Sequence, residues 1–269
     1  MLLLPCTVPQ AMAQTPPAKA AGTRFEILDN SFLVEEAFNQ EAGVFQNIFG
    51  VRFYEGAEWD FGFTQEWPVG SQAHQFSYTI PVSRVGGETG FGDVLINYRY
   101  QALAESTRRP AFSPRVSVIL PSGRKQDGLG AGGVGWQVNL PFSKQRGDLY
   151  FHWNAGFTWL PGIDSADDVP RSDDGRDRLT PHLAGSTIWA ALPMFHLVLE
   201  TVAEFEERVD TLGMTSRATA FTLSPGLRGG WNVGDRQIIV GFAVPVSFAG
   251  DATGAGAFLY FSYELPFKR

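Results

Sequence analysis

The 269-residue chain has 18% charged residues and a formal net charge of −7, so it lacks the basic surface that nucleic-acid binding requires. No run reaches the roughly 18 consecutive apolar residues of a membrane-spanning helix, which excludes a helical membrane protein. A single cysteine, Cys6, excludes a disulfide framework and a thiolate metal site. A membrane β-barrel stays possible, because its polar lumen residues dilute its apolar face.

The first 41 residues differ in pattern from the rest of the chain. Residues 1–13 end in an Ala-Met-Ala cleavage signal and predict an export signal peptide that is truncated at its start, or else an unstructured apolar N-terminus. Residues 14–41 predict a periplasmic lead-in. Within it, S-F-L-V-E-E-A-F-N-Q (31–40) has near-helical apolar spacing and predicts a short helix at the periplasmic mouth or in the lumen. Glu35 and Glu36 are therefore plug or gate candidates, and a plain lead-in is the alternative.

Residues 42–269 alternate between apolar and polar side chains almost throughout, as transmembrane strands of about 9–11 residues do. The clearest stretch is D-L-Y-F-H-W-N-A-G-F-T-W-L (148–160), in which every second residue is apolar and four of these are large aromatics. Its length exceeds that of a usual soluble strand. The pattern predicts a closed, antiparallel, up-and-down transmembrane β-barrel of about twelve strands, over residues 42–54, 57–68, 73–84, 91–104, 110–121, 133–145, 148–161, 180–191, 194–207, 217–230, 236–248 and 256–267.

The connections between these segments alternate between short and long. The long ones fall near 85–90, 122–132, 162–179, 208–216 and 249–255, and the first outer link, near Glu55, is tight. Outer-membrane barrels have short periplasmic turns and longer outer loops. The alternation therefore predicts a bacterial outer-membrane location with both termini in the periplasm. The longest loop carries six aspartates, but their spacing does not match a calcium loop, so we predict no metal site and leave weak divalent binding open.

Tryptophans fall near the ends of the predicted strands. Amphipathic rings prefer the headgroup level of a membrane, so two aromatic belts are expected. The predicted belt residues are Trp59, Trp136 and Trp159 at the outer ends and Trp67, Trp189 and Trp231 at the periplasmic ends.

Charged and polar side chains on the other face of the strands would line the lumen, where a charge is tolerated only if it is wet or paired. They either form a paired network that partly fills the barrel or line a path that selects permeants. The candidates are Asp60, Glu66, Asp93, Arg99, Arg115, His152, Asn154, His196, Glu200, Glu204, Arg228 and Glu264.

Several stretches resemble the outer-membrane transporter family named for the MetA pathway of phenol degradation. They are D-N-S-F-L-V-E-E-A-F-N-Q-E-A-G-V (29–44), G-F-G-D-V-L-I-N-Y-R-Y-Q (90–101), P-R-V-S-V-I-L-P-S-G (114–123), V-N-L-P-F-S-K-Q (138–145) and F-H-W-N-A-G (151–156). The resemblance implies a monomeric barrel that passes small hydrophobic or aromatic compounds. It carries no catalytic motif and implies no cofactor.

The sequence thus predicts a non-enzymatic channel for passive passage of small hydrophobic or aromatic solutes. Its expected partners are outer-membrane lipid, lipopolysaccharide, the outer-membrane assembly machinery and the solutes themselves. One alternative is a structural or adhesion barrel that acts through its outer loops. Another is a lipid hydrolase, which needs a Ser–His pair such as Ser186 with His182 or His196 across neighbouring strands.

Overall fold

The structure, a computed structural model, describes residue 27 and residues 31–162, 177–209, 215–234 and 236–267. The predicted signal peptide (1–13) and most of the acidic loop (163–176) lie outside these residues.

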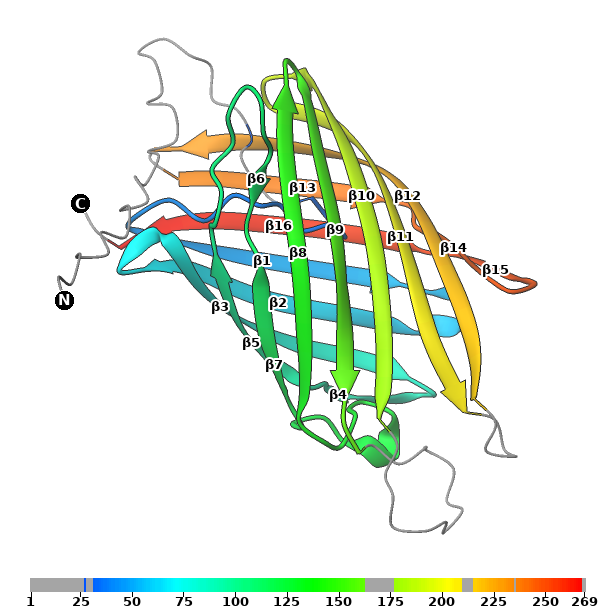
Figure 1. Cartoon of the computed structure of the whole chain (residues 1–269). Helices are drawn as coiled ribbons and strands as arrows, with labels where there is room; N and C mark the ends of the chain where they lie inside the picture. Colours follow the sequence, from blue (N-terminus) through cyan, green and yellow to red (C-terminus); the bar gives the residue numbers. More distant parts are fainter. Residues whose placement is uncertain (1–26, 28–30, 163–176, 210–214, 235, 268–269) are drawn as a thin grey trace, which may run out of the picture.

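Twelve long antiparallel strands form a closed barrel, with each strand paired to its two neighbours and four short strands added at the rims (Figure 1). Closure comes from the pairings of β1 with β16 and of β11 with β12. In Figure 1, β8 to β11 in front cross β1, β2 and β16 behind, as the tilted strands of a closed barrel do. The barrel strands are β1 (Val44–Phe53), β2 (Trp59–Val69), β3 (Ser71–Val85), β5 (Val94–Tyr100), β7 (Arg115–Leu120), β8 (Gly135–Arg146), β9 (Leu149–Leu160), β10 (Arg178–Leu192), β11 (Phe195–Val209), β12 (Thr215–Val233), β13 (Arg236–Ala243) and β16 (Ala257–Pro266).

The alternation predicted for residues 148–160 sorts the side chains of β9 between two faces. Tyr150, His152 and Asn154 point inward and are buried. Trp153 and Phe157 point outward and keep 40% and 38% of their surface exposed. An exposed apolar outer face around a buried polar inner one is the reverse of a soluble core, so the prediction of a transmembrane-type barrel fold is confirmed.

The tryptophans lie where the sequence placed them along the strands. Trp136 and Trp159 are directly paired across β8 and β9, next to the longer connections, and Trp59 begins β2 on the same rim. Trp67, Trp189 and Trp231 lie within a few residues of the short turns on the other rim. Their role as membrane belts stays a prediction.

Short turns gather at one rim of the barrel and most of the longer connections at the other. β2 and β3 are joined by Gly70 alone, at φ 71°, and β8 and β9 by residues 147–148. Val44 pairs with Pro266, so both ends of the barrel sequence lie at this short-turn rim. On the opposite rim, η1 (Glu55–Ala57), a single 3₁₀ turn, makes the tight first link.

Two connections predicted as long loops are β-hairpins instead. Residues 85–90 fold back through β4 (Glu88–Phe91), which pairs with β3, and 249–255 belong to the hairpin of β14 (Val246–Ala249) and β15 (Ala252–Ala255). Glycines at positive φ in the turns (Gly86, Gly87, Gly250) allow the reversal. In these two regions the apolar alternation stops because the strands continue beyond the rim of the barrel, and the residues there are paired and not in open loops.

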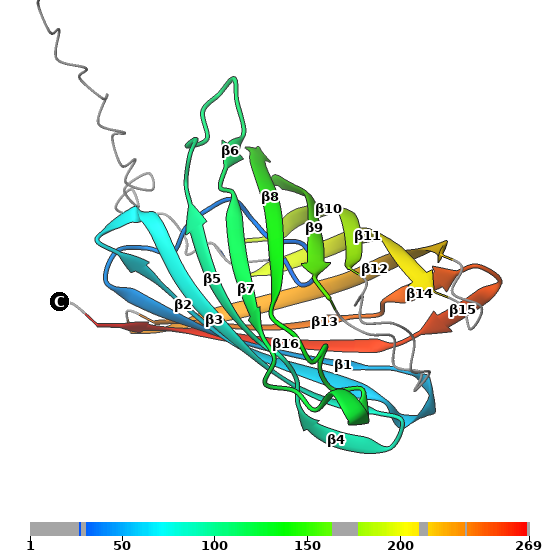
Figure 2. The same ribbon diagram turned by 60° about the horizontal axis from the view of Figure 1, so that its bottom comes forward.

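The connection between the strands predicted at 91–104 and 110–121 is longer than the short turn that these ranges imply. β5 ends at Tyr100 and β7 begins at Arg115, and the intervening residues form a narrow extension with a Leu103–Phe112 bridge and β6 (Ala111–Phe112) paired to β8. Figure 2 shows it rising beyond the neighbouring strands. The opposite link between β7 and β8 carries η2 (Lys125–Asp127).

The predicted short helix within residues 31–40 is wrong. These residues form bends and an irregular extended chain, because side chains of the barrel wall and not an internal helical ladder satisfy their backbone N–H groups. No helix among the described residues is long and apolar enough to span a bilayer.

If the outward face contacts hydrocarbon, Leu199→Arg on β11 should be costly. Leu199 points outward with 48% of its surface exposed, and an arginine at the bilayer midplane costs ~2–4 kcal/mol. Urea unfolding from lipid vesicles should show a loss of that order. Val202→Arg, which faces the interior cavity from the same strand, is the control and should cost clearly less. Equal costs at both positions would show that the two faces are not lipid and lumen.

Candidate functional site

Residues 31–43, here called the inner segment, lie in the space that the barrel strands enclose (Figures 1 and 2). Phe32 packs against residues of β16 and against Gly226 and Gly241, deep in the bore. Farther along, Asn39 donates hydrogen bonds to the carbonyls of Gln72 and Ala73, beside the short β2–β3 turn. From residue 31 onward the segment therefore runs from the interior of the barrel to the short-turn rim, where β1 begins.

Polar side chains of the wall satisfy the backbone of the inner segment. The carboxylate of Glu200 on β11 accepts hydrogen bonds from the N–H groups of Leu33 (2.8 Å) and Val34 (3.0 Å), and its residue is fully buried. Ser186 on β10 pairs through its hydroxyl with that of Ser31 at 2.6 Å. These wall residues hold a segment that has no secondary structure of its own.

A second group of contacts fixes the middle of the inner segment to β8 and its neighbours. Ala37 N–H donates to Ser143 Oγ at 2.7 Å, and Ser113 Oγ donates to Ala37 O at 2.6 Å. Ser143 Oγ also lies 2.7 Å from Nδ1 of His152, whose ring meets Phe38 edge to face. Ala37 and the two serines have no exposed surface, so this contact is sealed from water.

The strongest polar anchor is the carboxylate of Glu35. It forms ion pairs with Arg115 at 2.9 Å and Arg99 at 3.4 Å, and it accepts a hydrogen bond from Asn139 at 2.5 Å. Burial by itself raises the pKa of this carboxyl, but the two guanidinium groups and the Asn139 hydrogen bond outweigh it and hold the pKa below the ordinary 4.5. Asn154 binds the backbone N–H and carbonyl of the same residue. Glu35 is thus held as an anion.

Arg99 binds the rest of the E-E-A-F-N stretch. Its guanidinium donates to the carbonyls of Glu36 (3.0 Å) and Phe38 (2.8 Å) and to the side-chain oxygen of Asn39 (2.9 Å). Its residue is 2% exposed, and Glu66 lies 4.0 Å away as a further carboxylate. One arginine therefore replaces the internal hydrogen bonds that a helix would have supplied.

A cavity of about 380 Å³ lies beside the inner segment. Its polar lining includes four of the predicted lumen residues and one of the two plug candidates, and its apolar lining comes from the segment and the facing wall. The lining includes Glu35, Glu66, Arg115, Asn154, Glu204, His182, Phe32, Ile48, Val202 and Tyr260.

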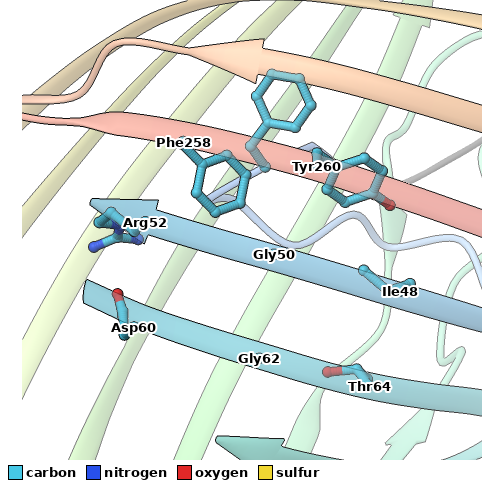
Figure 3. Close-up of a pocket in the computed structure, with 9 residues that line it drawn as sticks. Ile48, Gly50, Arg52, Asp60, Gly62, Thr64, Phe258 and Tyr260 are labelled. Carbon is cyan, nitrogen blue, oxygen red and sulfur yellow. The ribbon is translucent and has the colours of Figure 1, made fainter. Parts of the chain in front are cut away.

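A second cavity of about 200 Å³ lies toward the longer-loop rim (Figure 3). Phe258 and Tyr260 of β16 face it, with Arg52 and Asp60 at one end and Ile48 and Thr64 at the other. Asp60 accepts a hydrogen bond from Tyr54 at 2.8 Å. Arg52, which the sequence analysis did not single out, donates to the same hydroxyl at 3.2 Å and lies over the Phe258 ring.

The remaining predicted lumen residues serve as local supports. Arg228 donates to His196 at 3.3 Å, and Gln40 of the inner segment donates to Glu264 at 3.4 Å. The carboxylate of Asp93 accepts hydrogen bonds from the N–H groups of Gly123 and Ala131. Asp93 therefore fixes the 121–134 connection and does not line either cavity.

The interior also contains apolar clusters that alternation did not predict. Ile27, Ile239, Phe258 and Tyr260 are buried together on one side, with Phe32 packed on them. Tyr150, Ile188 and Val198 form a second buried cluster that Phe32 also touches. The available signal was a strand such as 257–263, whose aromatic side chains occur on both faces.

The Ser–His pairs considered for a hydrolase are not formed as expected. Ser186 bonds Ser31, and His182 lies 3.3 Å from Asn139. The pair that does occur, Ser143 with His152, is packed beneath Ala37 and Phe38 and serves the inner segment. Among the described residues, no three His, Cys, Asp or Glu side chains are grouped so that they could hold a metal ion.

Solved structures with a similar fold include outer-membrane channels. The NanC porin aligns with a TM-score of 0.50 at 11% identity, covering 83% of this chain and all of that one. The channel DcaP of Acinetobacter baumannii (TM-score 0.36, 13% identity, 86% and 100% coverage) and OmpT, an outer-membrane protein of Vibrio cholerae (0.35, 8%, 82% and 98%), also align. The likeness to the NanC porin supports the barrel fold alone and says nothing of a permeant.

No protein-family model and no curated protein sequence matches the chain. The resemblance to the phenol-degradation transporter family therefore stays a prediction.

Glu35→Gln should loosen the inner segment, because Arg99 and Arg115 then lose the anion between them. Breaking a buried ion pair costs ~3–5 kcal/mol, and we expect the lower end because the Glu35 side chain is 20% exposed. Amide hydrogen exchange over residues 31–40 should speed up accordingly. Glu41→Gln, an exposed carboxyl on the same segment, should leave exchange unchanged.

Acid should have the same effect on the wild-type protein. Since the pKa of Glu35 is lowered by folding, its contribution is complete above pH 4.5 and is lost as the pH falls through the lowered value. Exchange over residues 31–40, corrected for its intrinsic pH dependence, should therefore rise below pH 4.5 in the wild type and rise less in Glu35→Gln. Identical pH profiles would remove Glu35 as the anchor, because a response shared by both proteins would come from other titratable groups nearby, such as Glu36, Glu66, His182 and Glu204.

Proposed function

We propose that the protein is a bacterial outer-membrane channel for passive passage of small apolar or aromatic solutes. Both termini would be periplasmic, since the short-turn rim carries both ends of the barrel sequence. Lipid and lipopolysaccharide would cover the outward face, and the outer-membrane assembly machinery would insert the barrel. The aspartate-rich outer loop could bridge lipopolysaccharide phosphates through divalent ions.

One observation supports the proposal: a segment of the chain, and not only the wall, occupies the interior of the barrel. Hydrogen bonds, ion pairs and ring contacts hold this segment, and the 380 Å³ cavity lies beside it. All of these contacts are reversible. Displacing residues 31–43 would join the two cavities into a wider path, so the segment fits the role of a plug or gate, with Glu35 as its polar anchor.

Two features favour apolar or aromatic permeants. The first is the resemblance of the sequence to the phenol-degradation transporter family. The second is the interior patch of Phe32, Phe258, Tyr260 and Ile48, because sites for small apolar molecules are lined mainly by hydrophobic and aromatic side chains. Lumen acids and arginines would exclude unsuitable charges.

The proposal includes no catalysis. A serine hydrolase needs a nucleophile that substrate can reach. The hydroxyls of Ser143 and Ser186 are both hydrogen-bonded to the inner segment and buried beneath it.

Planar-bilayer recordings test the channel. A variant that lacks residues 27–40 should conduct ions well above the wild-type level, because the barrel strands begin only at Val44. A variant with residues 31–40 replaced by a Gly/Ser sequence of equal length is the matched control for chain length and should also conduct. Circular dichroism checks that both barrels are folded. If folded barrels without the segment pass no ions, the protein is a structural or adhesion barrel.

A further inference from the structure

A recess in the inner wall accepts one aromatic ring. Gly226 on β12 and Gly241 on β13 leave a gap between the strands' inward side chains, and Phe258 and Tyr260 of β16 border it. A methyl group at Gly241 would overlap Cε1 and Cζ of Phe32, and one at Gly226 would lie 2.9 Å from Cε2. The recess therefore exists only because both positions lack a side chain, and a flat ring fills it.

Phe32 occupies this recess through ring contacts. Its centroid lies 5.7 Å from that of Phe258 and 5.3 Å from that of Tyr260, with interplanar angles of 48° and 45°. These distances are those at which tilted aromatic pairs attract each other. The contacts depend on a planar ring and on no other property of phenylalanine, so a free aromatic molecule would satisfy the recess equally well.

The 200 Å³ cavity adjoins the occupied recess and is lined by the same three rings. Gly50 and Gly62 are paired in its wall and present a flat, side-chain-free panel (Figure 3). A cavity of ~150 Å³ is enough to hold benzene in another protein. At the end toward the longer-loop rim, Asp60 and Arg52 offer an acceptor and a donor, and Nε of Arg52 has no hydrogen-bond partner.

We propose that this cavity binds uncharged single-ring aromatic molecules and that Phe32 is their intramolecular competitor. A ring bound against Phe258 lies beside Phe32 and gains the same contacts by taking its place in the recess. That exchange frees Phe32 from the wall and loosens the inner segment on the side of β12, β13 and β16, while Glu35 still binds Arg99 and Arg115. The inference rests on the proposed channel function and assigns it a ligand class and a site.

Thiol labelling of the full-length protein tests the exchange. In a Cys6→Ser background, Ser31→Cys places a small thiol at a position that is 3% exposed and next to Phe32. Benzyl alcohol should raise the rate at which a polar maleimide labels this thiol, and the rate should reach a plateau at high benzyl alcohol concentration. Cyclohexylmethanol has the same heavy atoms but a puckered ring, and it should leave labelling unchanged. Equal acceleration by both alcohols, or by neither, overturns the exchange.

Two variants connect the effect to the recess. Phe32→Leu keeps an apolar side chain but loses the ring contacts, so the ligand competes with a weaker occupant of the recess. The benzyl alcohol concentration that gives half of the maximal labelling rate should therefore fall by about tenfold. Gly241→Ala should expel the Phe32 ring and give fast labelling without ligand, whereas Gly185→Ala, whose nearest neighbour would be at 3.5 Å, should behave as wild type. An unchanged Gly241→Ala protein contradicts the recess.

The outcome is separable from that of the channel test. If the variant lacking residues 27–40 conducts but benzyl alcohol does not affect labelling, the channel stands and the exchange is wrong. If labelling responds while the deleted barrel stays closed, the ring site stands without a transport role.

Discussion

A polar group on the inner face of a closed barrel must be hydrated or paired, and this requirement organises the interior of the protein. Glu200, Arg99 and Asn154 are 0%, 2% and 5% exposed, far from bulk water. Backbone N–H and carbonyl groups of the inner segment are their partners. The wall therefore needs the segment as much as the segment needs the wall, and the barrel interior is completed by a piece of chain that precedes the first strand.

The balance that keeps the segment in place is a close one. A typical hydrogen bond contributes about 0.5–1.5 kcal/mol net, whereas ordering the backbone of one residue costs ~1–2 kcal/mol. The backbone contacts to Glu200 or Ser143 do little more than offset the order they impose. The net stability of the segment's position inside the barrel must come from stronger interactions, which are the Glu35 ion pairs and the Phe32 ring contacts. Losing either should loosen the segment.

The sequence predicts the barrel well because its main signal is local. The period-two alternation of 148–160 and the sorting of short and long connections both follow from a membrane on one side of each strand, so strand number, faces and rims could be derived. Glu35 and Glu36 stood out as a charged pair before the first strand. The helix predicted there failed because apolar spacing cannot reveal that Arg99 and Glu200, distant in sequence, would bind the backbone.

The interior apolar clusters were beyond this reasoning for a related cause. The alternation of side chains along the last strand assigns Phe258 and Tyr260 to the lumen. Only the tertiary structure shows that Phe32 and two glycines on other strands complete a ring site around them. Gly226 and Gly241 carry no side-chain signal at all. These glycines matter because they leave space for the Phe32 ring, and the sequence of a single strand does not show which residue will fill that space.

The two anchors hold the inner segment to opposite walls. Glu35 binds residues of β5, β7 and β8, whereas Phe32 binds β12, β13 and β16, which lie across the ring of strands. Because the two anchors bind opposite walls, the chain between Phe32 and Glu35 crosses the bore. These three residues span at most about 10 Å, so the two side chains cover the rest of the distance. A solute that displaces only the ring leaves the segment tied to the arginines, and protonation of Glu35 leaves it tied by the ring. Neither event alone would free both walls, so release of the whole segment would require the loss of both sets of contacts.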